Sequence, residues 1–532
     1  MKLFTKTTLL TSLLILFSLS RLSFAQQIRD FNLDGHSTLH KSARLLGNSV
    51  TDLKMGNLNS IWIGTGKGLN FTSDNGTTFE EYIPRDELDI GKGGVSALAV
   101  MGDIVIVANA FDDPDVEESN GTGSGLTISM DNGFSWTHID QPKDADDALF
   151  EIIFGDTIDA LPIVIDVDNV TFDIAIAITE DTTIYITSFA GGVRSSTDFG
   201  ATWKRIVLPP DEEDVLTDSS IHDFDLSPVN NTFFGVTGSF NHRPFSVIAW
   251  GDTVIVGTAG GINRSIDGGV SWYKFTSRNR SGISGDWAVS LHRHQWNGEE
   301  TILAATRPTV AGEFLGVSLT KDGGISWRTV LRGQRVWNFA SDDSVLYAAA
   351  DSGLFKSVDG GITWASFSDI TDRETDTPLY TQTVYSAIVM PDKRLWAGTA
   401  DGLVHTDNDG FTWTILRAQK STSEPGSVRT YSYPNPFSPA RHNTFGGDGH
   451  VRFHYSLSEE STVSISVYDF SMTLVAEPVK GVLRNASEWD EVWTGRNGFG
   501  NIVANGTYFY KISIRSVSGR EEALWGKVMV IE

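Results

Sequence analysis

Short apolar runs recur along residues 48–418, and turns rich in Gly, Asp and Asn separate them. Examples are Val50–Met55, Thr253–Thr258 and Arg394–Thr399, in which β-branched and aromatic residues are frequent. No segment spaces its apolar residues as a helix does, so the pattern predicts an all-β chain. The runs come in groups of four, and the groups repeat seven times. This arrangement predicts a seven-bladed β-propeller.

One motif, Ser/Thr-x-Asp-x-Gly-x-Ser/Thr-aromatic, falls between the third and fourth runs of each group. Its copies span Thr72–Phe79, Ser129–Trp136, Ser196–Trp203, Ser265–Trp272, Thr320–Trp327, Ser357–Trp364 and Thr406–Trp413. The third positions are Asp74, Asp131, Asp198, Asp267, Asp322, Asp359 and Asn408. An Asp there can accept hydrogen bonds from its own turn, and the Gly permits a positive φ. Because Asn408 keeps the acceptor and loses the charge, we expect these seven residues to be structural.

The motif resembles the Asp box of the sialidase, or BNR-repeat, propellers, and the resemblance covers roughly residues 47–416. That group includes sialidases, xyloglucanase-type glycosidases, sortilin-like receptors and photosystem assembly factors. The resemblance therefore implies the fold and leaves the function open. In such a propeller the motif turns lie on one face. The longer loops lie on the other face, where we expect any ligand site.

The chain has 532 residues, no cysteine and a formal net charge of −26. The lack of cysteine excludes disulfides and thiolate metal sites, and the acidity disfavours nucleic acid and anionic membranes as partners. Residues 1–25 have the pattern of a signal peptide, with two lysines, the apolar run Leu9–Leu19 and a small-x-small site ending at Ala25. The run is shorter than the ~20 residues that span a bilayer. We predict cleavage near Ala25 and a secreted or cell-surface protein that does not span the membrane.

The C-terminal part of the chain differs from the repeats. Alternating apolar residues in Ser461–Tyr468 and Gly506–Ser516 predict the half-buried strands of an Ig-like β-sandwich. This part resembles bacterial C-terminal modules of the FlgD-like and type IX secretion sorting kind, and the residues that carry the resemblance are Tyr433–Pro439, Val467–Asp469, Trp493–Gly498, Gly506–Tyr510 and Lys527–Val530. The resemblance implies sorting, attachment or assembly, with secretion or surface-attachment machinery as partner. The predicted organisation is a signal peptide (1–25), a lead-in (26–47), the propeller (48–418), a linker (419–430) and the Ig-like domain (431–532).

The first strands of a propeller line its central channel, and here the residues at the predicted channel mouth combine aromatic and charged types. We predict a ligand site formed by Asp286, Trp287, Arg335, Trp337 and Tyr385. Aromatic rings beside Arg and Asp suit a sugar or a peptide, so the expected partner is a polysaccharide or protein outside the cell. The alternative is that the Trp side chains pack between blades.

No catalytic residue is predicted, and a non-catalytic binding or scaffold protein is the favoured function. The alternative is a secreted glycoside hydrolase, xyloglucanase-like or sialidase-like, that uses paired carboxylates on the loop face. Sialidases also need three arginines and an Arg-Ile-Pro element. The nearest phrase here is Tyr82–Arg85, which has a different order.

No metal or cofactor is predicted, although two patterns contain metal-binding residue types. His292 and His294 lie two apart on a predicted strand and so face the same side. Asp112, Asp113 and Asp115 can offer oxygen ligands to Ca²⁺, but they lack the spacing and the Gly of an EF-hand loop.

Overall fold

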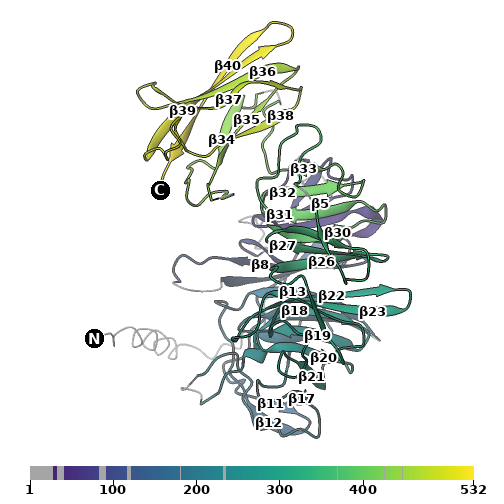
Figure 1. Cartoon of the computed structure of the whole chain (residues 1–532). Helices are drawn as coiled ribbons and strands as arrows, with labels where there is room; N and C mark the ends of the chain where they lie inside the picture. The colour runs from purple at the N-terminus through teal and green to yellow at the C-terminus, as the bar shows by residue number, and fades with distance from the viewer. Residues whose placement is uncertain are drawn as a thin grey trace.

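The structure of the protein is a computed structural model (Figure 1). It describes residues 28–32, 41–42, 44–82, 91–116, 121–179, 181–231, 235–367, 369–423, 426–445 and 447–532. The predicted signal peptide lies outside these residues. The described chain is all-β, and its helical segments are two short 3-10 turns, η2 (Asn57–Asn59) and η3 (Phe240–His242).

Seven antiparallel sheets occupy the described part of residues 28–416, and the four main strands of each pair in chain order. The first three sheets comprise β3 (Val50–Met55), β4 (Ile61–Thr65), β5 (Gly68–Thr72) and β6 (Phe79–Tyr82); β7 (Gly94–Met101), β8 (Ile104–Phe111), β9 (Thr122–Ser129) and β10 (Ser135–Ile139); and β13 (Thr171–Ile178), β14 (Thr182–Ser188), β15 (Gly192–Ser196) and β16 (Lys204–Ile206). The next two comprise β18 (Pro244–Trp250), β19 (Thr253–Thr258), β20 (Gly261–Ser265) and β21 (Trp272–Phe275); and β22 (Trp287–Trp296), β23 (Glu299–Arg307), β24 (Gly316–Thr320) and β25 (Arg328–Val330). The last two comprise β26 (Val336–Asp342), β27 (Val345–Ala350), β28 (Gly353–Ser357) and β29 (Ala365–Ser366); and β30 (Val384–Val389), β31 (Leu395–Thr399), β32 (Gly402–Thr406) and β33 (Thr414–Leu416). A separate hairpin pairs β11 (Phe150–Ile153) with β12 (Asp156–Asp159).

The seven sheets close into a ring, which is the arrangement of a β-propeller. The first strand of each sheet contacts the first strand of the next, and β30 contacts β3. Buried side chains fill the space between neighbouring sheets. Trp62 packs with Leu98 and Trp136 between the first and second sheets, and Trp396 packs with Leu53 between the seventh and first. In the described residues the first and seventh sheets each keep their own four strands. The ring therefore closes through side-chain contacts between these two sheets and not through a shared strand.

Three short strands extend the outer edges of sheets. They are β1 (Ile28–Asn32), which pairs with β10, β2 (Lys41–Ser42), which pairs with β6, and β17 (Val215–Leu216), which pairs with β21. Residues 26–47, expected to be only a lead-in, therefore contribute edge strands to two sheets. Short polar edge strands carry little apolar alternation, so the hydrophobic pattern does not reveal them.

The repeated motif forms the turn between the third and fourth strands, and its acidic residue holds that turn closed. Asp131 accepts hydrogen bonds from Ser129 Oγ (2.9 Å), the Ser135 backbone N (2.8 Å) and Ser135 Oγ (2.6 Å). Burial alone would raise the pKa of Asp131, but these bonds outweigh it and lower the pKa. Trp136 Nε1 donates to the Gly133 carbonyl at 3.1 Å, which fixes the ring beneath the turn.

The seventh copy makes the same turn with an amide. Asn408 Oδ1 accepts from Thr406 Oγ1 at 3.0 Å and from the Thr412 backbone N at 2.9 Å. Its Nδ2 donates to Thr412 Oγ1 at 2.8 Å, where a carboxylate would accept from that hydroxyl. The turn therefore needs the hydrogen bonds of this position and does not need its charge.

Replacing Asp131 with Asn should cost less stability than replacing it with Ala. Asn can repeat the contacts of Asn408, whereas Ala leaves the donors of Ser129 and Ser135 without this acceptor. We expect D131A to lower the melting temperature by roughly 2–4 °C and D131N by about 1 °C or less, measured by scanning calorimetry. Equal losses for the two variants would contradict this account of the turn.

Residues 430–530 form a second unit of two antiparallel sheets. One sheet has the order β34 (Thr430–Tyr433), β35 (Val451–Ser456) and β38 (Glu488–Trp493), and the other has the order β37 (Leu474–Arg484), β36 (Ser461–Tyr468), β39 (Gly506–Ser516) and β40 (Glu521–Val530). Both sheets line one core, with Phe453 and Trp489 from the first and Ile465 and Tyr510 from the second. This unit therefore has a core of its own.

A buried ion-pair network joins the second unit to the ring. Asp401, between β31 and β32, accepts hydrogen bonds from Arg417 of the ring (3.0 Å) and from Arg452 on β35 (2.6 Å). All three side chains are buried. Both arginines lie near the Asp490 carboxylate, which pairs with His454 Nδ1 at 2.9 Å. The second unit thus contacts the ring beside the seventh sheet, as Figure 1 shows.

The charge of His454 makes this junction sensitive to pH. Burial alone would lower the pKa of His454, but its interactions with Asp490 and Glu488 outweigh burial and raise the pKa from 6.5 to about 9. A group with a raised pKa contributes stability that is complete below its unfolded pKa and is lost as pH rises through its folded pKa. The junction should therefore loosen between about pH 7 and pH 10.

Protease cleavage within residues 419–430, followed across this pH range, measures the loosening. We expect the cleavage rate of the wild type to rise with pH and that of H454Q to be higher at neutral pH and nearly flat. Identical pH profiles for the two proteins would contradict the role given to His454.

Candidate functional site

The two faces of the ring carry different connections. The first residue of an inner strand pairs with the last residue of the second strand, as Trp287 does with Arg307 and Val384 with Thr399. The connections between sheets, and those between second and third strands, therefore lie at this end. The motif turns lie at the opposite end. We call the end with the longer connections the loop face.

Every inner strand has an irregular register near its start on the loop face. One residue is skipped in the pairing of each strand, and the skipped residues are Thr51, Ser96, Phe172, Phe245, Val289, Trp337 and Tyr385. A β-bulge of this kind redirects a side chain that would otherwise follow the pleat. In four of the seven strands the redirected side chain is aromatic.

These four aromatic residues and Trp287 form a continuous series over five successive inner strands, which we call the aromatic arc. Ring centroids are 5.4 Å apart for Phe172 and Phe245, 5.3 Å for Phe245 and Trp287, and 6.1 Å for Trp337 and Tyr385. Each of the five side chains is half-buried. The arc is therefore partly exposed to solvent at the loop face.

Arg307 links the two halves of the arc. Its guanidinium lies 5.1 Å from the ring centroid of Trp287 and 4.6 Å from that of Trp337. No described residue accepts a hydrogen bond from its Nε or Nη2. Burial, with a further contribution from nearby Arg335, lowers the pKa of Arg307 to about 10. Arg307 remains charged at neutral pH, without a direct counterion.

Arg335 and Asp351 stand beside the arc. Trp337 Nε1 donates to Asp351 Oδ1 at 2.6 Å, and Arg335 Nε lies 3.6 Å from Asp351 Oδ2. The Arg335 side chain is 46% exposed, so this ion pair is weak and open to exchange with a ligand. The arc thus combines apolar rings with both signs of charge.

Asp286 precedes Trp287 but is engaged by the neighbouring loops. Its Oδ1 accepts a hydrogen bond from the Ser277 backbone N at 2.6 Å. Burial raises the pKa of Asp286, and the charge of Glu313, to which its carboxyl also hydrogen-bonds, raises it further. Ser277 Oγ donates to Glu313 at 2.7 Å. The carboxyl pair therefore ties two loops of the loop face together.

The structure brings four of the five predicted ligand residues to the arc, namely Trp287, Arg335, Trp337 and Tyr385, and directs Asp286 to the loops. Sequence reasoning missed Phe172, Phe245 and Arg307. Phe172 and Phe245 occupy the same position in their strands as Trp337 and Tyr385, so an alignment of the repeats contains the signal. Arg307 carries no such signal, because it ends a second strand and reaches the arc only through the pairing of β22 with β23.

The inner strands also carry a cluster of half-buried titratable side chains. Lys54 Nζ lies 3.1 Å from Asp52 Oδ1. Burial raises the pKa of Asp173 to about 6, against the opposing effect of Lys54. Burial, followed by His294 and Lys54, lowers the pKa of His292 to about 4, so this imidazole is neutral. The positive charge of Lys54 thus interacts with the carboxyl groups of Asp52 and Asp173 inside the ring.

The two patterns of metal-binding residue types take other partners. His292 Nε2 lies 2.9 Å from Ser341 Oγ, and Asp113 accepts a hydrogen bond from the Asp115 backbone N at 3.0 Å. Within the described ranges, no three His, Asp or Glu side chains are grouped to hold a metal ion.

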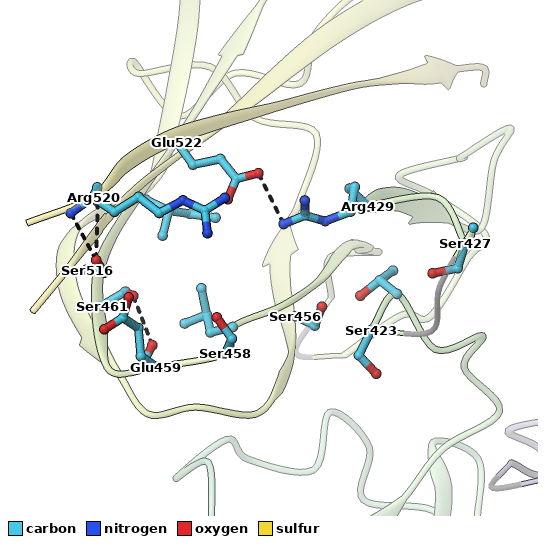
Figure 2. A pocket seen from close by; sticks show the side chains of 14 residues that line it. Ser423, Ser427, Arg429, Ser456, Ser458, Glu459, Ser461, Ser516, Arg520 and Glu522 are labelled. Carbon is cyan, nitrogen blue, oxygen red and sulfur yellow. Dashed lines mark hydrogen bonds and ion pairs between the residues drawn. The ribbon is translucent and has the colours of Figure 1, made fainter. Parts of the chain in front are cut away.

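A pocket of about 380 Å³ lies between the linker and the second unit (Figure 2). Hydroxyl groups of Ser423, Ser456 and Ser458 line it, and Arg429 pairs with Glu522 at 3.1 Å on its wall. Among the residues that the structure describes, no aromatic side chain lines this pocket. It therefore lacks the stacking surface of the arc, and we place the candidate ligand site on the loop face.

No family model and no curated protein matches the chain. Similar solved structures include PorZ, a surface component of the type-IX secretion system of Porphyromonas gingivalis, with 13% identity and a TM-score of 0.35 over 90% of this chain and 64% of PorZ. An ancestral GH74 enzyme has 14% identity and a TM-score of 0.45 over 90% of this chain and 62% of the enzyme. YCF48 from Cyanidioschyzon merolae has 14% identity and a TM-score of 0.34 over 84% of this chain and 98% of YCF48.

All three are β-propeller proteins. The chain spans less than two thirds of the length of PorZ and of the GH74 enzyme. In the part of the chain that the structure describes, no helix has the length and apolar character needed to cross a membrane.

Proposed function

We propose that the protein is an exported, non-catalytic binding protein, built as a seven-bladed β-propeller with a C-terminal Ig-like domain. The aromatic arc carries this proposal. Its five half-buried rings lie on successive strands and offer a surface that an extended ligand can follow. The expected partner is a polysaccharide or a protein outside the cell.

The carboxyl groups near the arc favour binding over hydrolysis. Asp286 and Glu313 both accept hydrogen bonds from Ser277, Asp286 from its backbone N at 2.6 Å and Glu313 from its Oγ at 2.7 Å. Glu313 Oε2 also accepts from the Thr309 backbone N at 2.6 Å and from Thr309 Oγ1 at 3.1 Å. A carboxylate with this many donors is held as a structural acceptor, and its nucleophilicity is low.

A panel of oligosaccharides and peptides, scored for binding and for released sugar, tests the proposal. Trp337→Ala should weaken the binding of any ligand found at least about tenfold, because it removes one of the two rings that flank Arg307. Trp296→Ala is the matched control, since Trp296 ends the neighbouring inner strand β22 on the face opposite the arc and is 39% exposed. W296A should bind like the wild type.

Two results would overturn this assignment. Equal binding by W337A and the wild type would remove the arc from the site. Linkage-specific sugar release that is lost on replacement of Asp286 or Glu313 would establish the glycoside hydrolase alternative.

We also propose that the C-terminal domain directs sorting or surface attachment, after signal-peptide cleavage near Ala25. The motifs shared with sorting modules support this role, and so does the separate core of the domain. A truncated chain that lacks residues 427–532 should fold its ring, because Asp401 keeps Arg417 as a partner. We expect this chain to lose surface attachment in cell fractionation. Unchanged localisation would contradict the proposed role.

A further inference from the structure

Arg307 is half-buried, and it differs from the buried arginines of the described chain in its lack of an ion pair. Arg194 pairs with Asp144 at 2.8 Å, and Arg417 and Arg452 share Asp401 at 3.0 and 2.6 Å. Arg307 has no carboxylate at such a distance, and its Nε and Nη2 are shielded from solvent without an acceptor. Two guanidinium nitrogens shielded in this way are costly, since they have lost water and gained no hydrogen bond. Folding alone does not explain this arrangement.

The two unpartnered atoms define the shape of the missing group. Nε–H and Nη2–H point in the same direction from one edge of the planar guanidinium. Two parallel donors match the two oxygens of a carboxylate, which is the strongest geometry that arginine offers an anion. The nearest carboxylate, Asp351, is already held by Trp337 Nε1 at 2.6 Å. The acceptor for this edge must therefore come from outside the described chain.

We propose that the aromatic arc binds a polysaccharide whose sugars carry carboxylates, and that Arg307 binds one of these carboxylates through Nε and Nη2. The proposal rests on the proposed function of the arc as a ligand site. Sugar rings lie against the aromatic side chains on both sides of Arg307, and the carboxylate reaches Nε and Nη2 once the side chains that shield them move aside.

The position of Arg307 within the arc favours a polysaccharide over the end of a peptide. Phe172, Phe245 and Trp287 lie on one side of the guanidinium, and Trp337 and Tyr385 lie on the other. A ligand that uses both halves of the arc presents its carboxylate from the middle of a chain. A uronic acid residue within a polysaccharide does so, whereas a C-terminal carboxylate ends its chain and leaves half of the arc unused.

The charge of the protein restricts the ligand further. The net charge of −26 repels a densely charged polyanion, so affinity must come from stacking and from a single well-placed ion pair. Neutral sugars between uronic acid residues fit this balance better than a chain with a charge on every sugar.

Matched acidic and esterified ligands provide the first test. Oligosaccharides that contain galacturonate, glucuronate or mannuronate are each compared with their methyl esters by isothermal titration calorimetry with the full chain. The ester keeps the sugar ring and removes the charge. We expect at least one acid form to bind about tenfold more tightly than its ester. Equal affinities in all three pairs, or no binding of any acid form, would overturn the proposal.

Variants locate the carboxylate contact. Arg307→Gln and Arg307→Lys should both abolish the preference for the acid form, because neither keeps two parallel donors. Arg293→Gln is the control, since Arg293 also stacks on a Trp, 4.0 Å from the centroid of Trp250, but pairs with Glu300 at 2.7 Å. R293Q should keep the preference, and melting curves confirm that each variant is folded.

The outcomes separate this inference from the proposed function. If W337A loses binding of acid and ester alike while R307Q keeps the preference for the acid, the arc binds ligands and the role of Arg307 is wrong. A preference for peptides with a free C-terminal carboxylate over their amides would assign the contact to a protein partner and would also overturn the proposal.

Discussion

Each sheet of the ring can bury its two faces only if it has a neighbour on both sides. This constraint explains why the first and seventh sheets meet through large side chains such as Trp396, although no strand passes between them. Removal of one sheet would expose the apolar faces of two others, so the stability of the ring is shared by all of its members. The motif turns lie at the end of the sheets where a short connection suffices, and their aromatic residues, such as Trp136, take part in this packing. The opposite end is free to carry long connections and a binding surface.

Much of this fold could be predicted from the sequence, because the same motif and the same pattern of apolar runs recur seven times. One motif copy with Asn408 in place of Asp indicated a structural role, and the amide reproduces the turn contacts of the carboxylates. Strands such as β36 (Ser461–Tyr468) and β39 (Gly506–Ser516) have the bounds that their alternation predicts. The edge strands β1 and β2 could not be foreseen, because their pairing supplies the stabilisation that their composition does not show.

The candidate site was less predictable, because its chemistry arises where separate strands meet. Aromatic residues at the starts of inner strands can be read from the repeats, as Trp337 and Tyr385 were. Arg307 reaches them only through the register of β22 with β23, and its lack of a partner is a property of the packed structure. The junction is a similar case, since Arg452 of the second unit meets Asp401 and Arg417 of the ring.

The junction also fixes the direction in which the arc points. Asp401 lies in a connection between a second and a third strand, so the C-terminal unit is docked on the loop face, the same face that carries the arc. A swivel of this unit would separate the buried charges, and a broken buried pair costs about 3–5 kcal/mol. If the C-terminal unit is the part by which the protein is held, the arc is turned toward the anchoring surface. A bound ligand would then lie between the ring and that surface, and the size of the C-terminal unit would set the distance between the two.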